Sequence, residues 1–369
     1  MPGTQERFQQ MVGERVKFAR TEAGMTQEQL SPKLGFKDRQ ILANIEGGKR
    51  KVAADELVKL MENLKKSIDF FTDPLILVGE GMFCWRASAG AAVLDSFEAK
   101  AKPIVAAYRE FCLGHASVTS PIHHELRLTK RSSYHEAQAA AEALVVQWKL
   151  EGVPGPKLAE AVEDRLGVAV LHVDAPPGIS GAACRLPEVN VVLISRNETM
   201  GRRSFDLAHE LFHLLTWNEM PPEHVEKDVP GGNKKSPVEY LADNFASALL
   251  MPREILQPLW ERRGHTDINE FIVRTSQRFL VSGQALYYRL INLGWLTEGD
   301  RMDIKMDRLS WPDTGEKPKL YSERFVKLLH RRLDEGWLSV RRATKVLDCT
   351  MEELGDLFRS YGLEPPFDL

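Results

Sequence analysis

The stretch "DLAHELFHLLTW", residues 206–217, places two histidines four positions apart, with a glutamate directly after the first. Residues i and i+4 lie on one face of an α-helix, so His209 and His213 can reach the same metal ion. Glu210 is rotated by about 100° around such a helix, where it can take a proton from a water molecule that the metal activates. From these residues alone, the alternative is a leucine-rich core helix with two satisfied histidines. A third ligand decides between the two.

Three side chains downstream are candidates for that ligand. Glu219 lies six residues after His213, at the third-ligand position of the long metzincin pattern. That pattern also needs a glycine three residues after the second histidine, and a threonine stands there. His224 lies in a loop rich in proline, glycine and lysine. Glu239 opens a second strong helical pattern and is the candidate that we favour.

The second helical pattern is "EYLADNFASALLMP", residues 239–252, which ends at a proline. It places Asp243 one turn after Glu239, where a carboxylate can hold a ligating histidine through its other ring nitrogen. Two histidines, one glutamate and an open position for water are typical of a catalytic zinc site. We therefore predict a Zn²⁺ site formed by His209, His213 and Glu239, with Asp243 behind it.

Together, "RRSFDLAHELFHLL" (202–215) and "EYLADNFASALLMP" resemble the ImmA/IrrE family of metallopeptidases, and the resemblance covers roughly residues 137–296. It implies a zincin-like endopeptidase fold with the same three ligands and Glu210 as the catalytic base. Many members of the family cut XRE-type repressors. Phe212 replaces a small residue that is usual in the motif, and we expect it to narrow the cleft or to reflect a changed substrate. Candidates for the residue that stabilises the transition state are Tyr240, His224 and Arg203.

Residues 8–64 contain four short helical patterns. The second, "TQEQLSPKLG" (26–35), opens with a capping box and carries Pro32, which would remove a backbone donor inside the helix. Two short helices joined by a tight turn form the helix-turn-helix arrangement, whose second helix enters the major groove of DNA. Between Lys33 and Lys51 there are six cations and two acidic residues, a net charge of +4 that suits a phosphate backbone.

Residues 13–52 resemble the XRE-type helix-turn-helix family along their length. The resemblance implies that a glutamine at the start of the second helix touches a phosphate and that the third helix reads bases. The residues that we assign to DNA binding are Gln27, Lys37, Arg39, Gln40, Asn44, Lys49 and Arg50. Asp38 departs from this pattern, because it would repel phosphate unless it caps the helix or contacts a cytosine. The alternative is a plain helical packing module with a solvated basic loop.

The rest of the composition excludes several classes of protein. The four cysteines are scattered without a CxxC pair, which favours a reducing cytosol over a disulfide framework. Uninterrupted apolar runs stay well below the roughly 18 residues of a membrane span. The N-terminal residues are polar and lack the apolar core of a secretion signal. We expect a cytoplasmic protein without membrane association.

The patterns divide the chain into four predicted parts and give a mainly α fold with a small β-sheet (α+β). These parts are a helix-turn-helix domain at 1–72, a helical connector at 73–136, a metallopeptidase domain at 137–300 and a C-terminal helical, helix-turn-helix-like domain at 301–369. For the last part, a dimerisation or sensing bundle is favoured over a second DNA contact.

The predicted function is that of a DNA-binding transcriptional regulator with a zinc endopeptidase domain, acting in stress response or mobile-element control. Its expected partners are a double-stranded DNA operator, a second copy of the chain and a protein substrate. That substrate would be a partner repressor, a toxin-like protein or the chain's own linker near residues 73–100. The alternative is a transcription factor or antitoxin whose peptidase-like domain senses a metal or a ligand and cuts nothing.

Overall fold

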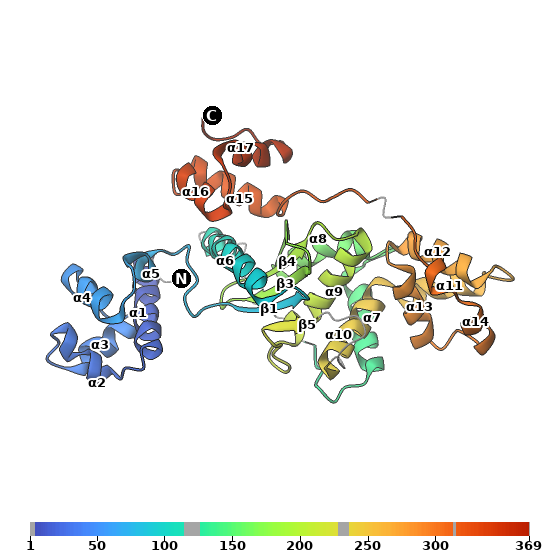
Figure 1. Cartoon of the computed structure of the whole chain (residues 1–369), viewed down its shortest axis with the longest axis horizontal. Coiled ribbons are helices and arrows are strands. Elements are labelled where there is room, and N and C mark those ends of the chain that lie inside the picture. The colour runs from blue at the N-terminus through green and yellow to red at the C-terminus, as the bar shows by residue number, and fades with distance from the viewer. Residues whose placement is uncertain (1–3, 114–125, 228–235, 313–314, 369) are drawn as a thin grey trace.

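The computed structural model describes residues 4–113, 126–227, 236–312 and 315–368, and these form a mainly helical molecule with one five-stranded sheet, as the sequence predicts. Figure 1 shows a separate helical domain at the N-terminal end, a central sheet covered by helices, and a C-terminal group of helices beside α6. Within the described residues, no helix is long and apolar enough to cross a membrane.

The N-terminal domain is a cluster of short helices around one apolar core. Its elements are α1 (Thr4–Glu22), α2 (Gln27–Leu30), η1 (Pro32–Leu34), α3 (Arg39–Glu46), α4 (Ala54–Leu64) and α5 (Ile68–Thr72). The capping box of Thr26 and Gln29 is present at the start of α2. The expectation that Pro32 lies inside the second helix is wrong. The helix ends at Leu30, and Pro32 occupies the first turn of η1, where a missing N–H breaks no helical hydrogen bond.

The sheet has the strand order β2-β4-β3-β1-β5. Its strands are β1 (Met82–Ala87), β2 (Ala169–Val173), β3 (Ile179–Arg185), β4 (Asn190–Ser195) and β5 (Val225–Lys227). β3 pairs antiparallel with β1 and β4, whereas β2 pairs parallel with β4 and β5 pairs parallel with β1. The apolar run "NVVLIS" of β4 is buried along its whole length, because both of its neighbours are strands and both sheet faces are covered.

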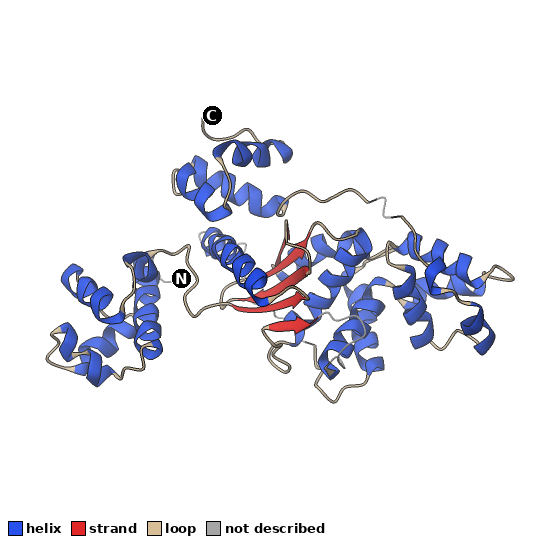
Figure 2. Ribbon diagram, viewed as in Figure 1, coloured by secondary structure: helices blue, strands red, loops and turns tan. Residues whose placement is uncertain are grey.

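Helices cover both faces of this sheet (Figure 2). α6 (Ala91–Leu113) lies on one face, and α9 (Met200–Thr216) contacts β3 and β4. β1 contributes to the cores on both sides, since Phe83 and Trp85 belong to the α6 cluster and Cys84 to the α9 cluster. The stretch 73–136, expected to be a helical connector, therefore supplies a strand and a covering helix.

The remaining helices of the central region surround α9. They are α7 (Tyr134–Trp148), α8 (Gly155–Leu166), α10 (Pro237–Leu250), α11 (Arg253–Glu261), α12 (Ile268–Phe279), α13 (Gly283–Asn292) and α14 (Glu298–Asp303). α10 packs against both α9 and α7. Arg289 of α13 is fully buried and donates to the backbone oxygen of Met251 and to the side chains of Gln138 and Glu142. This arginine fixes α13 to the α7–α10 pair.

The C-terminal helices pack on the outer side of α6. After η2 (Met306–Arg308), the chain forms α15 (Glu323–Asp334), α16 (Val340–Leu347) and α17 (Met351–Ser360). The ring of Phe325 lies 6.3 Å from that of Tyr108 and 6.0 Å from that of Phe111, centroid to centroid. α6 and the C-terminal helices therefore share one hydrophobic core with the sheet.

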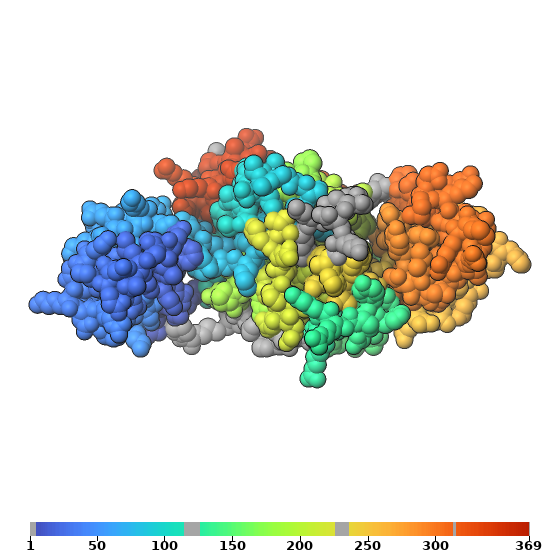
Figure 3. Space-filling view, turned by 60° about the horizontal axis from the view of Figure 1, so that its bottom comes forward, coloured from blue at the N-terminus to red at the C-terminus, as the bar shows by residue number. Residues whose placement is uncertain are grey.

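A buried arginine ties the N-terminal domain to the rest of the molecule. Arg15 is fully buried and donates to the carbonyl oxygens of Phe70, Asp73 and Ile76 at 3.1, 2.8 and 2.5 Å. Burial lowers the pKa of Arg15 to about 10, so it stays a cation at neutral pH. The carboxylate of Asp73 also forms an ion pair with Arg342 of α16. The linker is thus bound both by the N-terminal domain and by the C-terminal helices, and Figure 3 shows the N-terminal domain beside the rest of the molecule.

Candidate metal centre and nucleic-acid interface

Each of the two motif helices begins after a residue whose side chain caps it. Thr199 caps α9 by accepting from the backbone N–H of Arg202, and Ser236 caps α10 by accepting from that of Glu239. α9 is buried continuously from Asp206 to Thr216 because it lies between the sheet and the helices α8 and α10. This burial explains why apolar residues surround the two histidines.

His209, His213 and Glu239 bring one potential ligand atom each to a common point. The Nε2 atoms of the two histidines are 3.1 Å apart. The carboxylate of Glu239 lies 3.2 Å from Nε2 of His209 and 3.6 Å from Nε2 of His213. Zinc bonds of about 2.0–2.1 Å in a tetrahedral arrangement would separate ligand atoms by about 3.3 Å. The three donor atoms therefore fit a zinc ion.

One further carboxylate, that of Asp243, stands next to this cluster. Oδ1 of Asp243 lies 3.1 Å from Nδ1 of His209. A proton on Nδ1 directed at Asp243 leaves the Nε2 lone pair free for a metal. Glu210, the residue after the first histidine, is fully buried on α9.

The alternative ligands lie elsewhere. Glu219 is exposed in the turn after α9. His224 lies with Nε2 3.2 Å from a carboxylate oxygen of Glu98 and with Nδ1 3.1 Å from the carbonyl oxygen of Phe83. In the part of the chain that the structure describes, the group of His209, His213 and Glu239 is the one found with metal-ligand spacing.

The residues considered for transition-state stabilisation are also placed. Arg203 donates to the backbone oxygens of Glu198 and Glu316. Tyr240 is largely exposed, with its ring 6.1 Å from that of Tyr134. None of the contacts described for these residues, or for His224, joins the metal cluster.

Phe212 lies in the interface between the two motif helices. Its side chain is fully buried, and its ring lies 5.5 Å from that of Phe245 of α10. The larger residue at this motif position therefore contributes to the packing between α9 and α10. A narrowed cleft or a changed substrate stays a prediction.

Sequence reasoning missed Arg86 and Asp206. Arg86 of β1 is 4% exposed, and its Nη1 lies 3.3 Å from Oδ1 of the fully buried Asp206 on α9. The signal was the arginine inside the apolar run "MFCWRA" (82–87), since a charge within a buried strand needs a partner.

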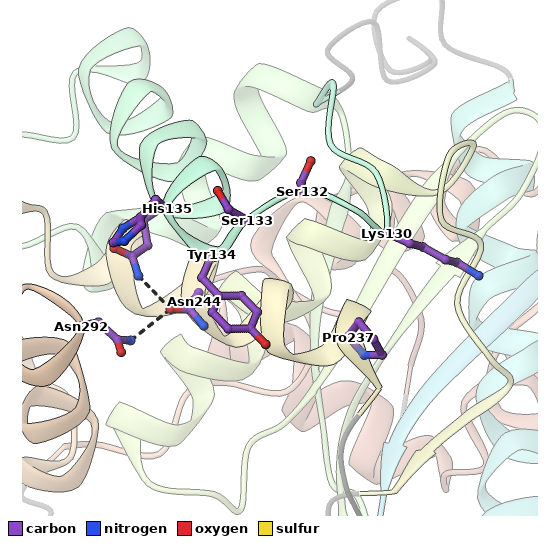
Figure 4. Close-up of a pocket in the computed structure, with 9 residues that line it drawn as sticks. Lys130, Ser132, Ser133, Tyr134, His135, Pro237, Asn244 and Asn292 are labelled. Carbon is purple, nitrogen blue, oxygen red and sulfur yellow. Dashed lines mark hydrogen bonds between the residues drawn. The ribbon is translucent and has the colours of Figure 1, made fainter.

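A cavity of about 540 Å³ lies beside α10, between α7 and α13. Figure 4 shows its mostly polar lining, in which the side-chain oxygen of Asn244 accepts from Gln138 and Asn292 at 2.8 and 3.0 Å. Asn244 follows Asp243 on α10, and its hydrogen bonds are made to α7 and α13 rather than to α9. The cavity therefore lies next to the metal-ligand helix on a side other than that of the cluster.

The third helix of the N-terminal domain presents the side chains expected at a DNA surface. Leu42 and Ile45 are fully buried and anchor α3, while Lys37, Arg39 and Gln40 are exposed. Asp38 caps α3, since its Oδ1 accepts from the backbone N–H of Gln40 at 2.9 Å. Of the two roles that would spare Asp38 from repelling phosphate, the structure shows the helix cap.

Several of the expected DNA contacts also have partners within the chain. Gln40 donates to half-buried Asn44 at 3.2 Å. Gln27 donates to Glu46 at 2.8 Å, a carboxylate that also pairs with Arg20. An exposed ion pair joins Arg39 to Glu28 at 2.7 Å, whereas Arg50 pairs with the buried carboxylate of Glu56 at 2.8 Å. Lys49 is exposed. An exposed pair is weak in water, so Arg39 can exchange its carboxylate for DNA.

Comparison with known proteins agrees with both halves of this description. Residues 13–70 match the family described as a helix-turn-helix domain, and residues 163–291 match the IrrE N-terminal-like domain of the M78 peptidases. The chain therefore joins an XRE-type helix-turn-helix domain to an IrrE-like peptidase-family domain. The likeness of the second domain to this peptidase family agrees with a metal ion at the point where the two histidines and Glu239 meet.

Two curated relatives share part of the second domain. The radiation response metalloprotease IrrE of Deinococcus deserti is 31% identical over 105 residues, which is 28% of this chain and 37% of the relative. The protein of the same name from Deinococcus radiodurans is 30% identical over 105 residues, 28% of this chain and 31% of the relative. The chain thus spans about a third of the length of these relatives.

Proposed function

We propose that the chain is a DNA-binding transcriptional regulator whose IrrE-like domain is a zinc endopeptidase that cuts a separate regulatory protein. The observation that carries the proposal is the grouping of His209, His213 and Glu239, whose ligand atoms all lie within 4.8 Å of one another. Three protein ligands leave a coordination position for water, as in catalytic rather than structural zinc sites. The likeness to IrrE metalloproteases supports this assignment.

In the proposed reaction, residues of α9 and α10 have separate roles. A bound zinc ion would supply Lewis-acid polarisation of a water molecule and of the scissile carbonyl. Glu210 takes the proton of the attacking water and gives it to the leaving amine. Asp243 holds His209 in the tautomer and orientation that a ligand needs.

The folded state of the chain's own linker favours a separate protein as the substrate. A peptidase needs an accessible, extended segment. Residues 73–100 contain β1, with Trp85 fully buried, and the beginning of α6. Self-cleavage within residues 82–87 would require β1 to leave the sheet, and the carbonyls of Asp73 and Ile76 before it are bound by Arg15. Cleavage of a partner repressor or a toxin-like protein does not require this chain to unfold.

We infer that the helix-turn-helix domain delivers the peptidase to an operator in the cytoplasm. The exposed side chains of Arg39 and Gln40 on α3 are of the types that pair with guanine and adenine edges. Binding as a homodimer would place two such helices on successive half-sites. Stress response and mobile-element control are the settings in which cleavage of a regulator would act as a switch.

The first test is the zinc content of the purified chain. We expect about one zinc per chain in the wild type and a loss of zinc in Glu239→Ala. Glu219→Ala is the matched control, because Glu219 is an exposed glutamate near the end of α9. It should keep its zinc. Absence of zinc from the wild type, with metal supplied during expression, would contradict the proposed site.

The second test separates a peptidase from a sensor. Glu210→Gln keeps the size of the side chain but cannot accept a proton. Zinc content and DNA binding should be unchanged, while new protein N-termini found by mass spectrometry in cells with the wild type should disappear. Unchanged operator regulation in this variant would instead favour a transcription factor or antitoxin whose peptidase-like domain senses a metal or ligand.

A further inference from the structure

We propose that Arg86 of β1 is a positioning residue of the metal centre, which holds the first turns of α9 and with them His209 and Glu210. The proposal rests on the metal site of the proposed function, but not on cleavage of any substrate. Arg86 lies outside the stretch that matches the IrrE-like family.

Arg86 reaches α9 from the middle of the sheet. In the register of β1 and β3 it stands opposite Gly181. A side chain at position 181 would meet the backbone oxygen of Leu193, 2.7 Å from where its Cβ would lie, so β3 presents only a glycine at this pair. The arginine is 4% exposed, and its charge is therefore held inside the protein.

The first contact to α9 is the ion pair with Asp206. Oδ1 of Asp206 lies 3.3 Å from Nη1 of Arg86, and Oδ2 lies 3.1 Å from Nε of Arg202. Asp206 is fully buried, and a buried carboxylate is strongly destabilising without its cation. Asp206 precedes His209 by three residues and Glu210 by four, so its side chain is a helical neighbour of each of these two residues.

The second contact to α9 is the ring of Phe205. Cζ of Arg86 lies 5.6 Å from the ring centroid of Phe205, which in turn lies 6.5 Å from that of His209. Arg86 thus contacts two successive residues of α9 that point in different directions. A helix held in this way cannot rotate without breaking one of the contacts, and rotation would move His209 away from Glu239.

The test compares Arg86→Lys with a matched variant, Arg109→Lys. Arg109 of α6 is also buried, at 3% exposure, and is ion-paired with Glu80, but it belongs to the opposite side of the sheet. Lysine keeps the charge and loses the planar fork that meets both a carboxylate and a ring. Both variants should lower stability in urea unfolding of the full chain.

Zinc affinity, measured by competition with a chromophoric chelator, should fall about tenfold in Arg86→Lys and stay within about twofold in Arg109→Lys. The visible absorption bands of the Co²⁺-substituted protein should shift in Arg86→Lys only. Asp206→Asn should reproduce the loss of affinity, and the double variant should add little to it, since both residues act through one contact.

Unchanged zinc affinity and Co²⁺ spectra in folded Arg86→Lys and Asp206→Asn would overturn the positioning role. Equal losses of affinity in Arg86→Lys and Arg109→Lys would do the same, because they would reflect general destabilisation. A wild type that binds no zinc would overturn this inference together with the proposed function. A wild type that binds zinc and cuts nothing would overturn only the latter.

Discussion

His209 has a carboxylate of α10 at each of its ring nitrogens. Asp243 lies at Nδ1, and Glu239, one turn earlier, lies at Nε2. The two carboxylates have different tasks in the proposed site, because one orients the ring and the other shares the metal. Glu239 and Asp243 are four residues apart on α10, and His209 and His213 are four residues apart on α9. The two helices face each other through these four side chains.

We expect Asp243→Ala to weaken zinc binding by about 10- to 100-fold, although no ligand is removed. The orientation and basicity of His209 depend on the lost carboxylate. Chelator competition measures the change. The matched control is Asn244→Ala, the next residue on α10, whose hydrogen bonds run to α7 and α13. It should lower stability and leave zinc affinity in place, and an equal effect of both variants would contradict the role of Asp243.

We expect single residues of the DNA surface to act in two different ways. Arg39→Ala should lower affinity for an operator found by in vitro selection by about 10- to 100-fold and relax its sequence preference. Lys49→Ala should weaken binding to all sequences and reduce the salt dependence by about one phosphate contact. Lys345→Ala, an exposed cation of α16, should bind DNA as the wild type does. Equal sequence preference of Arg39→Ala and wild type would contradict base reading by α3.

At the scale of elements, the sequence predicted helices whose functional or apolar residues recur on one face. The α9 and α10 patterns and the capping box at Thr26 are set by local spacing, and the structure has them. β1 was not predicted, because a strand covered on both faces has no polar alternation. Its membership of the sheet depends on β3, which lies about a hundred residues away along the chain.

His172 of the edge strand β2 should make the free energy of unfolding depend on pH. Burial, and to a smaller extent the charge of Arg203, lower the pKa of His172 from its usual 6.5 to about 4. Between these values the unfolded chain binds more protons than the folded one, so the free energy of unfolding falls as the pH is lowered. The expected contribution is about 2 kcal/mol between about pH 7 and pH 5. Urea unfolding of His172→Gln should show a smaller change than the wild type, and an identical change would contradict this.

At the scale of the whole molecule, the parts are joined by structure rather than by loose linkers. Arg15 holds the carbonyls of the linker after α5, and Arg342 of the C-terminal helices pairs with Asp73 in the same linker. The orientation of the DNA-binding domain therefore depends on contacts made by both ends of the chain.

We expect a fragment of residues 137–300 to be aggregated or unfolded, and a fragment of residues 73–368 to be monodisperse. The shorter piece lacks β1, which leaves an edge of β3 unpaired, and lacks α6, which leaves one sheet face open. Gel filtration and thermal unfolding measure the difference. A stable, monodisperse fragment 137–300 would show that the predicted domain boundary at residue 137 is sufficient.

The place of β1 in the sheet also limits how such a chain can arise by recombination between genes. A crossover upstream of Met82 exchanges one DNA-binding domain for another and leaves the strand with the IrrE-like part of the chain. A crossover between Ala87 and residue 163, where the IrrE-like match begins, would leave the incoming half without the strand that β3 and β5 both pair with. Ancestral fusions of this kind should therefore have their breakpoints before the strand, in the short segment after α5.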